Sequence, residues 1–227
     1  MAILADMLRV LPRRVEATAA TPLRSGERIV ALGDSITEDG GYLRMIDAVF
    51  ALHRGALRLP PIRNAGVGGN QSCDMLARFD RDVLSHRPGR VTINVGVNDV
   101  WHNLGLRDDA PVLRRYRADL AKMVERARHA GCEVLLLAPT VIEERADSDG
   151  NRRLVRYVDA MREIASAAGC GFCGLHALFL AALEASPRPY NWLTTDGVHM
   201  RPEGDAVIAI GVLRALGVCD EHIAATE

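Results

Sequence analysis

The chain has 227 residues, of which 48% are hydrophobic and 25% are charged, and its formal net charge at pH 7 is −1. This is ordinary globular composition, and the balanced charge gives no electrostatic reason to expect nucleic acid or an anionic membrane as a partner. No stretch approaches the roughly 18 apolar residues that a membrane-spanning helix needs, and the N-terminal apolar run is too short for a signal peptide, so we expect a cytoplasmic protein.

Residues 1–24 are a predicted N-terminal extension, and residues 25–227 form one predicted domain. Within the extension, residues 1–10 have the spacing of a short amphipathic helix. We expect this helix to pack against its own domain or against a second subunit. The second possibility would make the protein a homo-oligomer.

From residue 28 onwards, short apolar segments alternate with longer amphipathic segments. The apolar segments are predicted strands, at residues 28–32, 61–64, 91–95, 133–138 and 171–174. The amphipathic segments are predicted helices, at residues 41–52, 73–85, 110–129, 152–168, 176–185 and 202–216. The polar stretch 145–153 is an expected solvated loop. This alternation predicts βαβ units, and therefore a parallel sheet that is covered by helices on both faces.

The cysteines are odd in number and scattered, which does not indicate a disulfide framework. We expect all of them to be reduced, buried thiols, namely Cys73, Cys132, Cys170, Cys173 and Cys219. The pair Cys170 and Cys173 has C-x-x-C spacing but lies in an apolar, strand-like run. No second pair completes a metal site, so the sequence predicts no bound metal.

Polar segments follow the first three predicted strands, where the reactive groups of a parallel sheet are expected. They are G-D-S-I-T at 33–37, N-A-G-V-G-G-N at 64–70 and G-V-N-D at 96–99, and D-G-V-H at 196–199 precedes the last helix. Together these segments supply a hydroxyl, a backbone donor loop, a carboxamide, a carboxylate and an imidazole.

Acyl transfer needs this set of groups. A serine hydroxyl such as that of Ser35 is a poor nucleophile until a base removes its proton, and His199 is the candidate base. Asp196 lies three residues before His199, and on a tight turn its carboxylate can reach the Nδ1–H of the ring and select its tautomer.

The tetrahedral oxyanion of such a reaction needs preorganised hydrogen-bond donors. The backbone amides of Ser35 and Gly69 and the side-chain amide of Asn98 are the candidates, and glycine at position 69 permits a close backbone approach. The alternatives are that Ser35 is a helix cap and that Asn98 is a turn residue. Asp34 and Asp99 are expected to brace their loops.

In this order, the four segments resemble those of the GDSL or SGNH hydrolase family, whose blocks are centred on a serine, a glycine, an asparagine and a histidine. The matching residues are Ser35, Gly69, Asn98 and His199, with Asp196 as the triad acid. The resemblance implies a flavodoxin-like, three-layer α/β/α sandwich with a central parallel sheet of about five strands. It also implies that catalysis needs no metal or organic cofactor.

The resemblance covers residues 27–216, and D-V-L at 82–84 and G-V-N-D-V-W at 96–101 look like the bacterial branch that contains acetylxylan esterases and related carbohydrate deacetylases. By analogy with this branch, Trp101 and Trp192 line the acyl or sugar site, since aromatic faces stack well on sugar rings. We also place Asp34 among the residues around the substrate.

The chain departs from the family in its N-terminal extension and at two further places, of which the short loop after Ser35 bears on the substrate because it helps shape the pocket. The loop after Ser35 is short, at 38–41, and Met200 follows His199 where proline is common. We therefore predict a serine esterase whose partner is a small acylated substrate, an acetyl or other short-chain ester of a carbohydrate or similar alcohol. The alternatives are a lysophospholipase, thioesterase or arylesterase with the same chemistry, and a non-catalytic binding protein on this fold.

Overall fold

The centre of the protein is a single sheet. The computed structural model describes residues 2–13, 16–18, 22–52 and 57–225. The strands are β1 (Ala17–Thr18), β2 (Ile29–Gly33), β3 (Arg63–Gly66), β4 (Arg90–Asn94), β5 (Glu133–Leu137) and β6 (Gly171–Cys173), in the six-stranded order β1-β6-β5-β4-β2-β3. Strands β2 to β6 pair in parallel, and β1 pairs antiparallel with β6. The predicted parallel sheet is confirmed, and β1 adds an edge strand that was not predicted.

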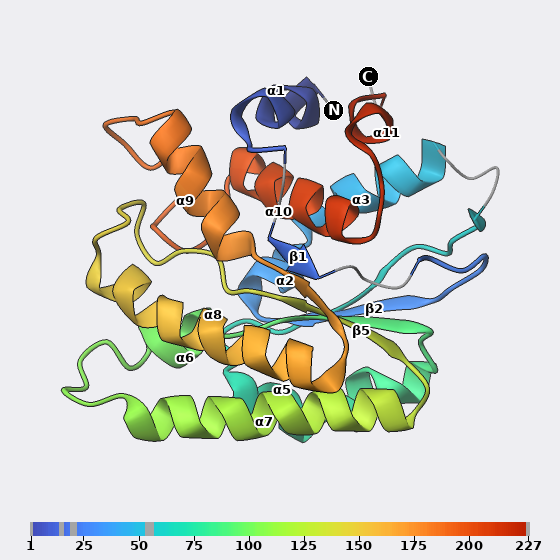
Figure 1. Ribbon diagram of the computed structural model, residues 1–227, viewed down its shortest axis with the longest axis horizontal. Coiled ribbons are helices and arrows are strands. Elements are labelled where there is room, and N and C mark those ends of the chain that lie inside the picture. Colours follow the sequence, from blue (N-terminus) through green and yellow to red (C-terminus); the bar gives the residue numbers. More distant parts are fainter. Residues whose placement is uncertain (1, 14–15, 19–21, 53–56, 226–227) are drawn as a thin grey trace.

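Helices cover both faces of the sheet, as Figure 1 shows. One layer contains α1 (Ala2–Val10), α3 (Gly41–Leu52), α9 (Leu175–Ala185), α10 (Pro202–Ala215) and α11 (Asp220–Ala224). The opposite layer contains α5 (Ser72–Asp82), α7 (Ala110–His129) and α8 (Asp149–Ala168). Every residue of β2 and β4 is buried. Burial on both faces explains why β2 is continuously apolar, whereas β4 buries the polar side chains of Arg90, Thr92 and Asn94 between its apolar residues.

A topological switch point lies between β2 and β4. After β2 the chain forms β3 on one side of that strand and then β4 on its other side. In open parallel sheets, the crevice at the carboxyl ends of the strands at such a point is the usual ligand site. Two short helices begin there, α2 (Ser35–Asp39) directly after β2 and α6 (Val97–Trp101) after β4.

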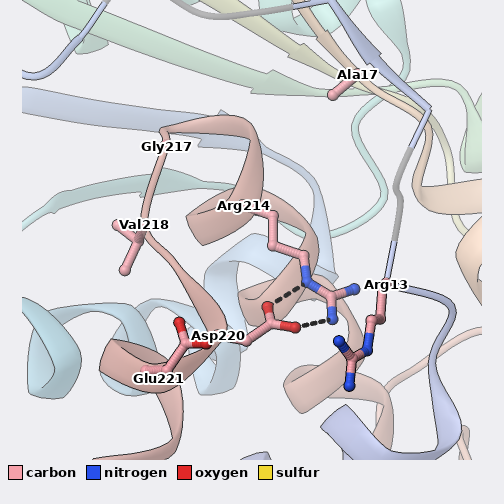
Figure 2. A pocket seen from close by; sticks show the side chains of 7 residues that line it. All are labelled: Arg13, Ala17, Arg214, Gly217, Val218, Asp220 and Glu221. Carbon is pink, nitrogen blue, oxygen red and sulfur yellow. Dashed lines mark hydrogen bonds and ion pairs between the residues drawn. The ribbon is translucent and has the colours of Figure 1, made fainter.

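The described part of the N-terminal extension packs onto the rest of the molecule. Helix α1 contacts α10 and α11, and its Leu4 and Met7 are buried. Arg214 joins this segment to the C-terminal region, since it donates a hydrogen bond of 2.7 Å to the Pro12 carbonyl and pairs with Asp220 at 2.7 Å. Figure 2 shows the Arg214–Asp220 pair in a surface pocket between the two ends of the chain.

Helix boundaries differ from the predictions where short polar segments start a helix. Helix α8 begins inside the polar stretch that was expected to be a loop, because the Ser148 hydroxyl caps it by accepting a hydrogen bond of 3.1 Å from the Asn151 amide. Helix α5 begins after Gln71, whose amide donates to Asp74 at 2.9 Å. Helices α2 and α6 were missed because five residues carry no detectable helical periodicity.

All five cysteines are free thiols. Cys132, Cys170 and Cys173 are buried, but Cys73 is half-buried and Cys219 is exposed. The expectation of buried thiols is therefore wrong for these two residues. Cys219 is the N-cap residue of α11, the short C-terminal helix, and its side chain faces solvent.

Candidate active site

The nucleophile candidate Ser35 is the first residue of α2, immediately after the buried strand β2. The helix cap is Asp34 and not Ser35, because the Asp34 carboxylate accepts a hydrogen bond of 3.0 Å from the Ile36 amide. The hydroxyl of Ser35 is therefore not needed for capping. Its Oγ lies 3.0 Å from Nε2 of His199, which is hydrogen-bond distance between a nucleophile and a base.

Asp196 orients the His199 ring. Its Oδ2 lies 2.7 Å from Nδ1 of His199, and its Oδ1 accepts hydrogen bonds from the amides of His199 at 2.8 Å and Val198 at 3.0 Å. Partial burial acts to raise the pKa of Asp196, but these hydrogen bonds lower it below the ordinary value. An ionised Asp196 keeps a proton on Nδ1, which leaves the Nε2 lone pair directed at Ser35.

The turn that carries Asp196 and His199 is held at its base by Glu144, which the sequence reasoning missed. The Glu144 carboxylate accepts hydrogen bonds from the amides of Trp192, Leu193 and Thr194 at 2.9, 2.8 and 2.6 Å, and from the Thr194 hydroxyl at 2.7 Å. The Thr194 Oγ1 accepts in turn from the amide of Gly197 at 3.1 Å. The one available signal was that Glu144 follows the fourth predicted strand, β5, near the active edge of the sheet.

The three predicted oxyanion donors lie on segments that follow β2, β3 and β4 at the carboxyl edge of the sheet. Gly69 has φ +75°, a left-handed conformation that favours glycine. Among the described residues, the backbone amides of Ser35 and Gly69 have no protein acceptor. The side chain of Asn98 is buried and donates one N–H to the Asn70 carbonyl at 3.1 Å, which leaves its second N–H available.

Two acidic residues brace the site from below. Asp34 is 1% exposed, and burial raises its pKa to about 7, so it lies too deep to contact a substrate directly as we had placed it. Asp99 accepts hydrogen bonds from the Ser72 hydroxyl at 2.7 Å and from the Ser72 amide at 3.1 Å, which ties α6 to the start of α5. This is the bracing contact that was expected of Asp99.

The two tryptophans occupy different environments. Trp101 is 36% exposed, and its ring meets the His199 ring edge-on at 5.9 Å between centroids. Trp192 is only 3% exposed, and the Arg188 guanidinium lies 4.5 Å from the centre of its ring. Trp101 therefore offers an exposed aromatic ring beside the candidate base His199, whereas the ring of Trp192 is buried.

Over the part of the chain that the structure describes, no group of three or more His, Cys, Asp or Glu side chains is arranged to hold a metal ion. Within the same residues, no helix combines the length and the apolar character needed to cross a membrane.

Comparison with known proteins shows similarity over nearly the whole chain. The model of the GDSL-like lipase/acylhydrolase family matches residues 31–207. An acetylxylan esterase from Geobacillus stearothermophilus is 27% identical over 212 residues, which cover 85% of this chain and 95% of that protein. An arylesterase from Vibrio mimicus is 25% identical over 92% of this chain and 98% of its own length, and the esterase TesA from Pseudomonas aeruginosa is 31% identical over 60% of this chain and 62% of its own.

Solved structures of related proteins also resemble the fold of this chain over most of its length. The crystal structure of the acetylxylan esterase from Geobacillus stearothermophilus superposes with a TM-score of 0.78 at 25% identity, over 88% of this chain and 98% of that one. The structure of LAE5, an alpha/beta hydrolase from the metagenome of Lake Arreo, has a TM-score of 0.77 at 29% identity, over 86% of this chain and 97% of its own.

Proposed function

The chain belongs to the GDSL-like lipase/acylhydrolase family, whose relatives are carboxylic ester hydrolases, and from this membership we propose that it removes acetyl or another short acyl group from a carbohydrate or similar alcohol. The observation that carries the proposal is the hydrogen-bonded chain from Ser35 through His199 to Asp196, at 3.0 and 2.7 Å. These three hydrogen-bonded side chains lie at the carboxyl edge of the sheet, beside hydrogen-bond donors suited to an oxyanion.

The proposed reaction has two halves. The Ser35 Oγ attacks the ester carbonyl while Nε2 of His199 takes its proton, and the oxyanion is held by the Ser35 and Gly69 amides and by Asn98. The C–O bond of the ester then breaks, and His199 returns the proton to the departing alcohol. Water attacks the acyl-enzyme with His199 again as base, which releases the carboxylic acid and regenerates Ser35.

Trp101 supports an alcohol with a flat, partly apolar face, such as a sugar ring. Because His199 delivers its proton to the leaving alcohol, an open ring 5.9 Å from the His199 ring is next to that alcohol. The relative with the name acetylxylan esterase acts on such a substrate, which favours the same class here.

The side chain of Glu38, which lies near Ser35, favours a short acyl group and a neutral substrate. Glu38 is exposed, and its Oε2 accepts a hydrogen bond of 3.1 Å from the Gly68 amide. A Cβ added at Gly68 would lie 2.9 Å from this oxygen and 3.8 Å from the Ser35 Cβ, so the carboxylate borders the nucleophile. A long apolar chain laid here would remove Glu38 from water without giving it a partner, and an anionic substrate would be repelled.

An ester panel tests the proposal. We expect the highest kcat/KM for acetylated xylo-oligosaccharides and p-nitrophenyl acetate, and low values for p-nitrophenyl octanoate, acetyl-CoA and lysophosphatidylcholine. Trp101→Ala is expected to lower kcat/KM for the acetylated sugar more than for methyl acetate, whose alcohol is too small to reach the ring. A preference for octanoate, lysophosphatidylcholine or acetyl-CoA would instead support the lysophospholipase or thioesterase alternatives.

The matched control for the chemistry is Ser35→Ala, which removes one oxygen atom and leaves the backbone donors in place. We expect this variant to fold normally, to lose ester hydrolysis and to lose labelling by a fluorophosphonate. Full activity in Ser35→Ala would refute the mechanism, and a wild-type chain that hydrolyses no ester and takes no label would indicate a non-catalytic binding protein.

A further inference from the structure

A buried arginine lies beneath the active site, on the inner face of α5. The side chain of Arg78 is only 8% exposed, and its carboxylate partner is Asp82, at 3.1 Å. A guanidinium removed from water needs hydrogen-bond acceptors for its donors, and its planar shape fixes the directions in which they must lie. The location of its acceptors therefore shows what Arg78 holds in place.

Arg78 binds the ends of two neighbouring strands and the loop that follows one of them. Nη2 donates to the carbonyl of Gly33 at 2.9 Å, and Nη1 donates to the carbonyl of Ala65 at 2.8 Å. Nε donates to the side-chain oxygen of Asn70 at 2.7 Å. Gly33 is the last residue of β2, two residues before Ser35, and Ala65 lies in β3.

Two of these three acceptors, Gly33 and Asn70, are close in sequence to a proposed oxyanion donor. Gly33 precedes the Ser35 amide by two residues, and Asn70 directly follows Gly69. The backbone carbonyl of Asn70 also receives the Asn98 side chain at 3.1 Å, so the third donor is positioned through the same residue. One rigid side chain thus joins the segments that carry all three donors.

We propose that Arg78 is a positioning residue that sets the spacing of the oxyanion donors, an inference that rests on the proposed hydrolase mechanism. Oxyanion donors must lie about 2.7–3.1 Å from the oxygen that becomes charged, and a misplacement of about 1 Å costs roughly 100-fold in rate. A lysine keeps the positive charge but has a point-like ammonium group that cannot reproduce the planar, three-way contact.

The test compares Arg78→Lys with Arg90→Lys. Arg90 is also buried and also pairs with an acid, Glu27, at 3.3 Å, but it is the first residue of β4, at the opposite edge of the sheet. We expect Arg78→Lys to lower kcat for p-nitrophenyl acetate about 100-fold with KM within about threefold of the wild-type value. Arg90→Lys is expected to lower the melting temperature and to leave kcat of the folded protein within about twofold.

A double variant separates positioning from a purely structural role. If Arg78 acts through the oxyanion donors, Arg78→Lys combined with Asn98→Ala lowers kcat by less than the product of the two separate effects. Multiplicative effects, or a folded Arg78→Lys with wild-type kcat, would overturn the inference. If Arg78→Lys does not fold, Asn70→Ala removes one of the three contacts, and an unchanged kcat in that variant would count equally against it.

The activity of Ser35→Ala distinguishes failure of the proposed role of Arg78 from failure of the hydrolase mechanism. Loss of activity in Ser35→Ala with no kcat effect in Arg78→Lys refutes only the role of Arg78. Retained activity in Ser35→Ala refutes the hydrolase mechanism on which that role rests.

Discussion

Replacing Glu144 by glutamine tests how the catalytic turn is held. The Glu144 carboxylate accepts four hydrogen bonds, three from consecutive backbone amides and one from the Thr194 hydroxyl. Glutamine has the same shape but only one acceptor oxygen, and its amide nitrogen can only donate. If the oxygen keeps the three contacts made by Oε1, the nitrogen faces the amide of Trp192, so that contact becomes two opposed donors.

The stability loss follows from these contacts. A hydrogen bond to a charged acceptor contributes about 1.5–3 kcal/mol, and one to a neutral acceptor contributes about 0.5–1.5 kcal/mol. Losing one bond and weakening three others by about 1–1.5 kcal/mol each sums to roughly 4.5–7.5 kcal/mol. Because water reaches this half-buried site and offers replacement partners, we expect about half of that sum, about 3 kcal/mol. For a chain of this size that is a melting temperature lower by roughly 6–12 °C. Because the same turn carries Asp196 and His199, we also expect kcat to fall at least about tenfold.

The neighbouring residue supplies the control. Glu143→Gln makes the same chemical change one position away, on an exposed side chain whose carboxylate accepts no hydrogen bond among the described residues. We expect Glu143→Gln to stay within about 0.5 kcal/mol of the wild type, as surface substitutions usually do. Urea unfolding and p-nitrophenyl acetate kinetics measure both effects. If Glu144→Gln matches Glu143→Gln in stability and in kcat, the proposed anchoring role of Glu144 is wrong.

Two further substitutions test the acids of the site. Asp196→Asn is expected to lower kcat by about 10⁴-fold with little change in KM, because the neutral side chain no longer selects the required tautomer of His199. Steady-state kinetics measure the loss, and a much smaller loss would mean that another acid orients His199. Asp34→Asn keeps the acceptor for the Ile36 amide but removes a carboxyl whose pKa rises from 3.8 to about 7 on folding. Between these two pKa values the folded state holds a proton that the unfolded state has lost, so stability falls as pH rises through that window, by roughly 4 kcal/mol in total. Urea unfolding at pH 4.5 and pH 8 should show a loss that is about 3 kcal/mol larger in the wild type than in Asp34→Asn, because both proteins share the smaller loss from Asp205, whose pKa burial raises to about 6. Equal losses in both would contradict the assignment.

The positions of the candidate site residues in the fold were predictable because parallel strands share one carboxyl edge. Ser35 and Asn98 follow β2 and β4, which are adjacent in the sheet, and Gly69 lies in the loop after β3. The alternation of apolar and amphipathic segments was enough to establish the direction of each strand. His199 was recognisable only together with Asp196, since neither follows a predicted strand.

The contacts that hold the site could not be predicted in the same way. Glu144 binds backbone groups 48 to 50 positions later in the chain, and hydrogen bonds from a side chain to a distant backbone leave no periodic pattern in the sequence. Trp192 illustrates the opposite error. Its place before the catalytic turn suggested a sugar contact, but the tertiary packing buries the ring beneath Arg188.

Arg78 and Glu144 both use a charged side chain to hold backbone groups next to the candidate site. At the carboxyl edge the strand pairing stops, so carbonyl and amide groups there need partners other than the next strand. Arg78 supplies donors to the carbonyls of Gly33 and Ala65, and Glu144 supplies acceptors to the amides before the catalytic turn. Each charged side chain thus binds several backbone groups at once and joins segments next to the candidate site residues. In the proposed mechanism these two residues act through the backbone and not through contact with the substrate, so we expect substitutions of Arg78 and Glu144 to change kcat more than KM.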